Sequence, residues 1–259
     1  MVEQLILDTL LLNNIFSQLI MFIFNKYNGK INLVMKVKKF IKIIICMSLM
    51  FILCSCGNDE VELNYTTKKV GDDTVYSIKT KKYVVSDEAT DLVMINVKNY
   101  GIMVAELYPD KAPITVENFK NLVSSNFYSG LIFHRVINGF VIQTGDPNGN
   151  GTGGSEETIK GEFESNGVKN DISHVRGVLS MARRGSDPET EETLNSASSQ
   201  FYIVQDDATY LDGNYAGFGK LVSGYDVLDR IASVETNMND KPLTDIVIEN
   251  VKFVKYYEE

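Results

Sequence analysis

The chain has 259 residues, with 25 Lys and Arg against 34 Asp and Glu, 44% hydrophobic residues, two His, three Cys and no Trp. The apolar fraction is enough for the core of one or two domains, which excludes a disordered or collagen-like polymer. The net charge of −9 argues against a nucleic-acid-binding protein, because phosphate contacts need clustered Lys and Arg.

Near the N-terminus, one segment has the pattern of an export signal. Residues 35–42 are basic, and residues 43–54 are almost wholly apolar. A run of about a dozen apolar residues is shorter than the roughly 20 that cross a bilayer, which favours a cleaved signal peptide over residues 35–55. We therefore expect translation to begin at Met35 rather than at Met1, which makes residues 1–34 a non-native upstream extension.

The apolar run ends in two cysteines. Leu53-Cys54-Ser55-Cys56 resembles the bacterial lipoprotein cleavage motif, in which a small residue precedes the cysteine that becomes the lipidated N-terminus. This resemblance implies an extracytoplasmic protein that a lipid on Cys56 anchors to the bacterial cell membrane. An uncleaved anchor and an ordinary secretory signal are the alternatives. After cleavage Cys56 would be the only cysteine, so no intramolecular disulfide is expected.

Residues 56–90 are rich in Asp, Glu, Lys, Thr and Ser, with scattered apolar positions such as Val75 and Tyr83. Such a composition buries too little apolar surface to fold alone. It predicts a polar tether with at most one short strand.

The folded part is predicted over residues 91–259, as one domain without an internal repeat. The β-rich runs 92–97 and 102–107 flank turn residues, which predicts a hairpin. After Pro113, with Thr115 as the N-cap, apolar residues at helical spacing predict an amphipathic helix on the sheet.

Between residues 130 and 219, short apolar runs alternate with glycine-rich loops, which indicates a closed or nearly closed antiparallel sheet. These runs are residues 131–133, 140–143, 178–182 and 200–204. A second helix is predicted over residues 225–233, and a last strand over residues 246–251.

The most specific segment is residues 133–146, Phe-His-Arg-Val-Ile-Asn-Gly-Phe-Val-Ile-Gln-Thr-Gly-Asp. It resembles the signature of the cyclophilins, a family of peptidyl-prolyl cis-trans isomerases. Further blocks match that family in the same order, at residues 150–154, 177–182, 199–203 and 211–220. The resemblance implies a mainly β fold, namely a closed eight-stranded antiparallel barrel capped by two α-helices. It also implies a monomer that acts on proline-containing unfolded or exported polypeptides.

The reaction of this family is rotation about an X-Pro bond, whose barrier is about 18–20 kcal/mol because amide resonance resists twisting. No bond breaks and no proton must leave, so we expect no cofactor, and two His without a thiol cluster predict no metal site. The twisted amide nitrogen regains a lone pair, which a permanently charged guanidinium can bind. Arg135 is therefore the predicted catalytic residue.

The resemblance also implies which positions bind substrate. The apolar positions that would hold the proline ring are Phe140 as the floor, Val141, Tyr202 and Leu211. Gln143 would bind the substrate backbone and support Arg135, and Gln200 would line the same groove. The remaining substrate-binding positions are Gly151, Ala182, Arg183 and Tyr215, with Arg183 acting through its backbone more than its side chain.

Several features allow a plainer reading. His134 is expected to pack rather than to act as a general base, because isomerisation needs none. Residues 150–154 are favoured as a turn along the groove over a phosphate-binding loop. The segment 186–198, which is rich in acidic residues, is either a solvated loop or a loop that favours substrates with basic residues beside the proline. For the whole protein, the alternative to an isomerase is a chaperone or scaffold module that binds proline segments with little turnover.

Overall fold

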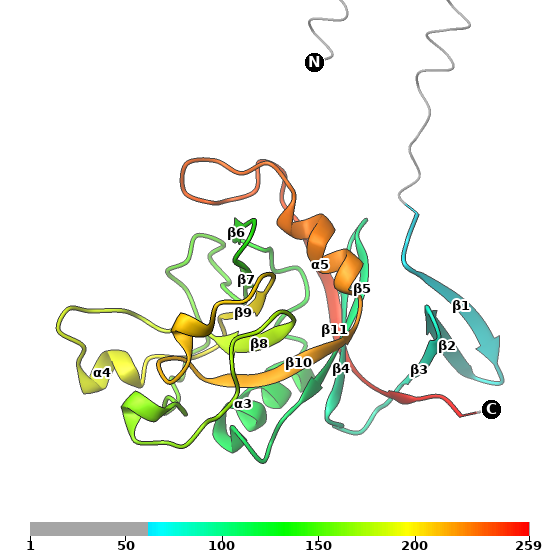
Figure 1. Cartoon of the computed structure of the whole chain (residues 1–259). Coiled ribbons are helices and arrows are strands. Elements are labelled where there is room, and N and C mark those ends of the chain that lie inside the picture. Colours follow the sequence, from blue (N-terminus) through cyan, green and yellow to red (C-terminus); the bar gives the residue numbers. More distant parts are fainter. Residues whose placement is uncertain (1–61, 259) are drawn as a thin grey trace, which may run out of the picture. The chain divides into compact units, whose positions relative to one another are not determined.

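The computed structural model of the chain describes residues 62–258 (Figure 1). The predictions for the upstream extension, the signal peptide and the lipidated Cys56 therefore lie outside the described residues. Within residues 62–258, no helix is both long enough and apolar enough to cross a lipid bilayer.

The described part is mainly β and is built on one antiparallel sheet with the strand order β1-β2-β3-β11-β4-β5-β10-β8-β9-β7-β6. The strands are β1 (Tyr65–Val70), β2 (Asp73–Ile78), β3 (Lys81–Val85), β4 (Leu92–Val97), β5 (Gly101–Leu107), β6 (Arg135–Ile137), β7 (Val141–Thr144), β8 (Val178–Met181), β9 (Phe201–Val204), β10 (Gly217–Ser223) and β11 (Ile248–Tyr256). The helices are α3 (Pro113–Ser124), α4 (Glu191–Leu194) and α5 (Tyr225–Ala232), with short 3-10 turns η1 (Glu164–Asn166) and η2 (Thr209–Leu211).

The expected closure of an eight-stranded barrel is not confirmed, because the sheet of residues 62–258 has eleven strands and the edge strand β6 forms a hydrogen-bonded ladder with β7 alone. Near that edge, an isolated bridge pairs Ile132 with Val247, and the Gly130 N–H donates to the carbonyl of Ile248 over 2.8 Å. Gly130 has a φ of 83°, so the chain leaves the extended conformation before it reaches β6. Irregular backbone contacts thus take the place of a ladder.

The tether expected over residues 56–90 also differs from the structure, because residues 65–85 form the three strands β1–β3. β3 pairs with β11, with Tyr83 opposite Tyr256. The side chain of Tyr83 is fully buried, and its hydroxyl is 2.7 Å from Ser223 Oγ. A few apolar residues on these strands are enough, because β4, β5 and β11 supply most of the cluster that they cover.

The hairpin of β4 and β5 and the helix α3 are confirmed, but Thr115 is not the N-cap of that helix. Thr115 is buried inside α3, and its N–H and hydroxyl donate to Glu162 Oε2 over 2.8 and 2.7 Å. The Ile114 N–H donates to the other carboxylate oxygen over 3.1 Å. Glu162, far along the chain, therefore satisfies the free N–H groups at the start of the helix.

The two predicted helices pack their apolar faces on the same core as the sheet, and Figure 1 shows them at opposite ends of the curved sheet. From α3, Phe119 meets Phe201 of β9 edge-on at 5.3 Å between ring centres. From α5, Val227, Leu228 and Ile231 are fully buried. A third helix, α4, lies in the acidic segment 186–198 and was not predicted.

Replacing Tyr83 with Ala should lower the free energy of unfolding by about 3 kcal/mol or more, because the change empties a large buried site and removes a buried hydrogen bond. The matched control is Tyr210→Ala, at a tyrosine that is 70% exposed, which should change stability by about 0.5 kcal/mol or less. Urea unfolding measures both. Equal midpoints for the two variants would show that β1–β3 are not part of the cooperative fold.

Candidate active site

Strand register places the predicted catalytic and supporting side chains beside one another. Arg135 on β6 lies directly opposite Gln143 on β7, and Gln143 lies opposite Tyr202 on β9. Residues directly opposite each other on neighbouring strands point to the same face of a sheet. The three side chains therefore form a row across β6, β7 and β9.

Hydrogen bonds continue from this row into the neighbouring loop. Gln143 Oε1 accepts from Arg135 Nη1 over 3.3 Å, and Gln143 Nε2 donates to Gln200 Oε1 over 2.9 Å. Gln200 Nε2 in turn donates to the carbonyls of Gly151 and Gly153, over 3.1 and 2.7 Å. Each amide uses its oxygen and its nitrogen, so the chain of bonds fixes both glutamines and supports Arg135 from one side.

Arg135 remains accessible, with 38% of its side chain exposed. Its Nε lies 3.6 Å from Asp240 Oδ2, and its guanidinium carbon lies 5.9 Å from the ring centre of Phe140. The guanidinium thus keeps donors free for a ligand while an ion pair and an aromatic face limit its movement.

The predicted proline-binding residues gather in one apolar cluster on this side of the sheet. Val141 and Tyr202 are buried in it, with 1% and 5% exposure, whereas Phe140 and Leu211 are partly exposed. Phe140 also stacks on Tyr210, with ring centres 5.9 Å apart. Val141 and Tyr202 therefore form the buried base of the cluster, whereas Phe140, the predicted floor for the proline ring, keeps the partial exposure that contact with a ligand requires. Ala182 and Tyr215 pack against the same cluster.

A cavity of about 310 Å³ adjoins this cluster through Ala182, which belongs to both. It is lined by Gln143, Gly151, Thr152, Gly153, Gly154, Ser155, Thr158, Ala182, Arg183, Arg184, Ser196, Ser198 and Gln200. The predicted site residues therefore divide into an apolar surface and a polar cavity, with Gln143 and Gln200 between Arg135 and that cavity.

Arg183 departs from the expectation that its side chain would matter little. That side chain is only 4% exposed and forms an ion pair with Glu189. Its guanidinium carbon lies 4.9 Å from the ring centre of Tyr215 and 5.2 Å from that of Phe163. The buried side chain of Arg183 therefore packs between two aromatic rings and pairs with Glu189, a role that its place in the sequence motif does not indicate.

Two acidic residues shape the site although the sequence did not single them out. Asp240 pairs with Arg135, and Asp146 accepts hydrogen bonds from the N–H groups of Asn148, Asn150 and Gly151. Burial opposes the charge of Asp146, but these three donors hold its pKa below the usual value. The turn-forming residues that follow Asp146 in the sequence could have predicted this loop. Within residues 62–258, no group of three or more His, Cys, Asp or Glu residues is placed to hold a metal ion.

Both histidines are buried. His134 is 5% exposed, and burial is the main effect that lowers its pKa. His174 is fully buried, with Nδ1 2.8 Å from Asp212 Oδ1 and Nε2 3.0 Å from Ser180 Oγ. Burial lowers the pKa of His174 more than Asp212 raises it. Two buried, neutral imidazoles fit a packing role better than a titrating one.

Comparison with known proteins gives a consistent result. Residues 92–253 match the family described as cyclophilin type peptidyl-prolyl cis-trans isomerase/CLD. A peptidyl-prolyl cis-trans isomerase-like 1 of Emericella nidulans is 38% identical over 60% of this chain and 90% of its own length. A peptidyl-prolyl cis-trans isomerase-like 2 of Rhizopus delemar is 41% identical, over 63% of this chain but only 29% of its own length.

Solved structures agree. The crystal structure of a cyclophilin type peptidyl-prolyl cis-trans isomerase from Cryptosporidium parvum aligns with a TM-score of 0.56 and 31% identity, over 65% of this chain and 98% of that one. The same protein was also crystallised in the presence of the dipeptide Ala-Pro. The chain belongs to the cyclophilin family of peptidyl-prolyl cis-trans isomerases, enzymes that interconvert the cis and trans forms of X-Pro bonds.

The pKa of each histidine should lie below 6.5 in the folded protein, because burial disfavours the charged imidazole. The unfolded chain then binds more protons as the pH falls below 6.5, so the free energy of unfolding should decrease, by at most about 1.4 kcal/mol per pH unit for each histidine. The chain has only two histidines, so their C2–H proton resonances can be followed directly by NMR. A midpoint at or above 6.5 for either resonance would contradict this account.

Proposed function

We propose that this chain is a membrane-tethered isomerase that speeds slow X-Pro steps in exported proteins, with Arg135 as its catalytic residue. The observation that carries the catalytic assignment is the supported but accessible guanidinium of Arg135, next to an apolar cluster and donating to Gln143. The proline ring would rest on the partly exposed residues of that cluster, Phe140 and Leu211.

In the proposed mechanism, one side of the X-Pro bond is held while the other rotates. The proline ring is bound on the apolar surface, and Gln143 and the loop at Gly151 hold the neighbouring peptide groups. As the amide twists, its nitrogen becomes a hydrogen-bond acceptor, and the guanidinium of Arg135 donates to it. A charge-assisted bond made mainly in the twisted state is worth about 1.5–3 kcal/mol, or roughly one to two decades in rate.

The alternative is a module that binds proline segments as a chaperone or scaffold, with little turnover. Binding requires only the apolar cluster and the polar groove. Arg135 has no structural need to remain 38% exposed in such a module. The accessible guanidinium therefore favours catalysis over binding alone.

Replacing Arg135 with Ala should lower kcat/KM for a proline tetrapeptide by about one to two decades, because the donor to the twisted amide is lost. Arg176→Ala is the control, since Arg176 is similarly exposed (34%) but is paired with Asp229 outside the site. A protease-coupled assay measures the rate, and NMR titration measures peptide affinity. If both proteins bind the peptide and neither isomerises it faster than the uncatalysed rate, the binding-module alternative replaces the enzyme, whereas equal acceleration by both removes Arg135 as the catalytic residue.

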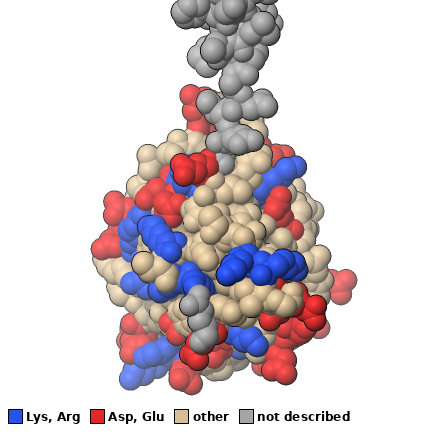
Figure 2. All heavy atoms as spheres, turned by 90° about the vertical axis from the view of Figure 1, so that its right-hand side faces the viewer, with Lys and Arg blue, Asp and Glu red and all other residues tan. Residues whose placement is uncertain are grey.

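The proposed tether is supported by the sequence motif at Cys56 and by the charge of the strands that follow it. Residues 65–85 contain five Lys and two Asp, whereas residues 86–258 contain 14 Lys and Arg against 26 Asp and Glu. Figure 2 shows the side that carries β1–β3, where basic side chains form a band between acidic ones. Eight residue steps from Cys56 to Asn64 reach at most about 30 Å. Lysines held that close to an anionic membrane surface are attracted to it, by about 1 kcal/mol each.

Expression of the whole chain in a bacterium should therefore give a protein that fractionates with membranes and incorporates a labelled fatty acid. Cys56→Ala should abolish labelling and release the protein from the membrane, whereas the neighbouring Cys54→Ala should not. Labelling of the Cys56→Ala variant, or an unlabelled wild-type protein, would remove the proposed anchor without affecting the isomerase assignment.

A further inference from the structure

The side chain of Arg183 is only 4% exposed. A guanidinium is rarely so buried unless a partner compensates its charge. Around it, Nε donates to the carbonyl of Asn214 over 3.1 Å, and Nη1 donates to the carbonyl of Arg184 over 3.3 Å. Tyr215 and Phe163 lie against it through their rings. These groups satisfy its donors but do not balance its charge.

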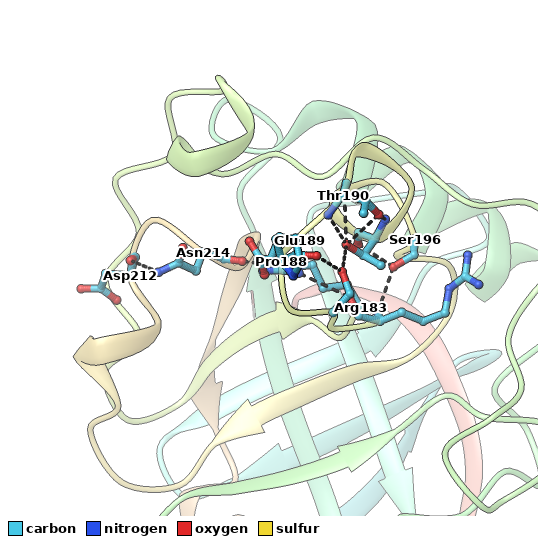
Figure 3. A network of polar contacts seen from close by, with 10 residues as sticks. Arg183, Pro188, Glu189, Thr190, Ser196, Asp212 and Asn214 are labelled. Atoms are coloured by element: carbon cyan, nitrogen blue, oxygen red, sulfur yellow. Dashed lines mark hydrogen bonds and ion pairs between the residues drawn. The ribbon is translucent and has the colours of Figure 1, made fainter.

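The balancing charge comes from the acidic loop, defined here as residues 184–198. Arg183 Nη2 donates to Glu189 Oε1 over 2.5 Å, and Figure 3 shows the two side chains pointing toward each other. Glu189 is followed by Thr190, whose side chain caps α4 in a reciprocal pair with Thr193. At the base of the loop, Ser196 Oγ accepts from the Arg184 N–H over 2.8 Å. The acidic loop is thus held at its base by Ser196 and at its middle by Arg183.

The same loop forms one wall of the cavity beside the apolar cluster. Arg184, Ser196 and Ser198 from the loop line that cavity, and the segment from Gly151 to Thr158 lines it as well. Among the described residues that line it, there are two arginines and no Asp or Glu. Glu189 is paired with Arg183, and Glu192 lies 3.2 Å from Arg184. The expectation that this loop favours basic residues beside the proline therefore finds no support, because the charged side chains that line the cavity are arginines, while the loop glutamates paired with them do not line it.

We propose that Arg183 is a positioning residue, whose ion pair with Glu189 holds the acidic loop as the wall of this cavity. With the wall in place, Arg184 faces the cavity and selects an acidic over a basic side chain beside the substrate proline. The substrate selection by Arg184 rests on the proposed function, whereas the position of the acidic loop is independent of it. Charge selection in a partly enclosed cavity is stronger than in open water, and salt weakens it.

Two matched variants test whether the ion pair of Arg183 and Glu189 clamps the acidic loop in place or whether the loop acts only through its charge. Glu189→Ala and Glu192→Ala each remove one carboxylate from the same loop, but only the first removes the partner of the buried Arg183. Hydrogen exchange of the whole protein, read by mass spectrometry, should show about tenfold faster exchange over residues 184–198 in Glu189→Ala and little change in Glu192→Ala. Equal exchange in the two variants overturns the proposed clamp, whether or not the protein is an isomerase.

The substrate arm uses two proline tetrapeptides that differ by Glu or Lys beside the proline. The wild-type ratio of kcat/KM, Glu over Lys, should be several-fold at low salt and fall toward one at high salt. Glu189→Ala should lower the ratio, because the wall loosens. Glu192→Ala should raise it, because Arg184 loses its partner. A rise in both variants, the result of charge alone, overturns the proposal. If the wild-type protein does not isomerise either peptide, the proposed function fails, and the same ratio is then read from peptide affinities by NMR.

Discussion

The hydrogen bonds of Gln143 are the interaction on which the site depends. Gln143 stands between Arg135 and Gln200, and it accepts from one while donating to the other. This is possible because β7 lies between β6 and β9 in a register that puts the side chains on one face. A slip of one residue would turn every side chain of β7 to the opposite face and disconnect Arg135 from the loop at Gly151.

Carboxylates inside the loops hold irregular segments in and around the site through hydrogen bonds and ion pairs. Asp146 accepts hydrogen bonds from N–H groups in the segment 148–151, and Glu162 accepts from N–H groups at the start of α3. Glu189 pairs with the buried Arg183 and so fixes the acidic loop. In each case a charged oxygen accepts from donors that would otherwise be unsatisfied, and it thereby holds an irregular segment in one conformation. A reaction that needs positioning more than proton transfer benefits from such a frame.

The sequence predicted the parts of this structure that depend on local patterns. Alternation and helical spacing identified the β4–β5 hairpin, α3 and α5, and the motif around Arg135 identified residues that register then brings together. The strands β1–β3 were missed because their few apolar residues are completed by a surface supplied from β4, β5 and β11. Contacts between distant residues were also beyond local patterns, as with Glu162 at the start of α3 or Asp240 beside Arg135. The acidic loop holds several carboxylates, and nothing in its sequence indicates that Glu189 is the one that meets Arg183.

The central claim is that the amide of Gln143 keeps Arg135 ready to stabilise the twisted X-Pro bond. It is tested most directly with Gln143→Met, which keeps the size of the side chain and removes both hydrogen bonds. Two-dimensional exchange NMR measures the rate of cis-trans interconversion and the affinity for an Ala-Pro peptide in one sample. The account predicts a rate at saturating peptide that is lower by about tenfold or more, with the peptide bound more weakly because the contact of Gln143 with its backbone is lost. A variant that isomerises the peptide as fast as the wild type would contradict it.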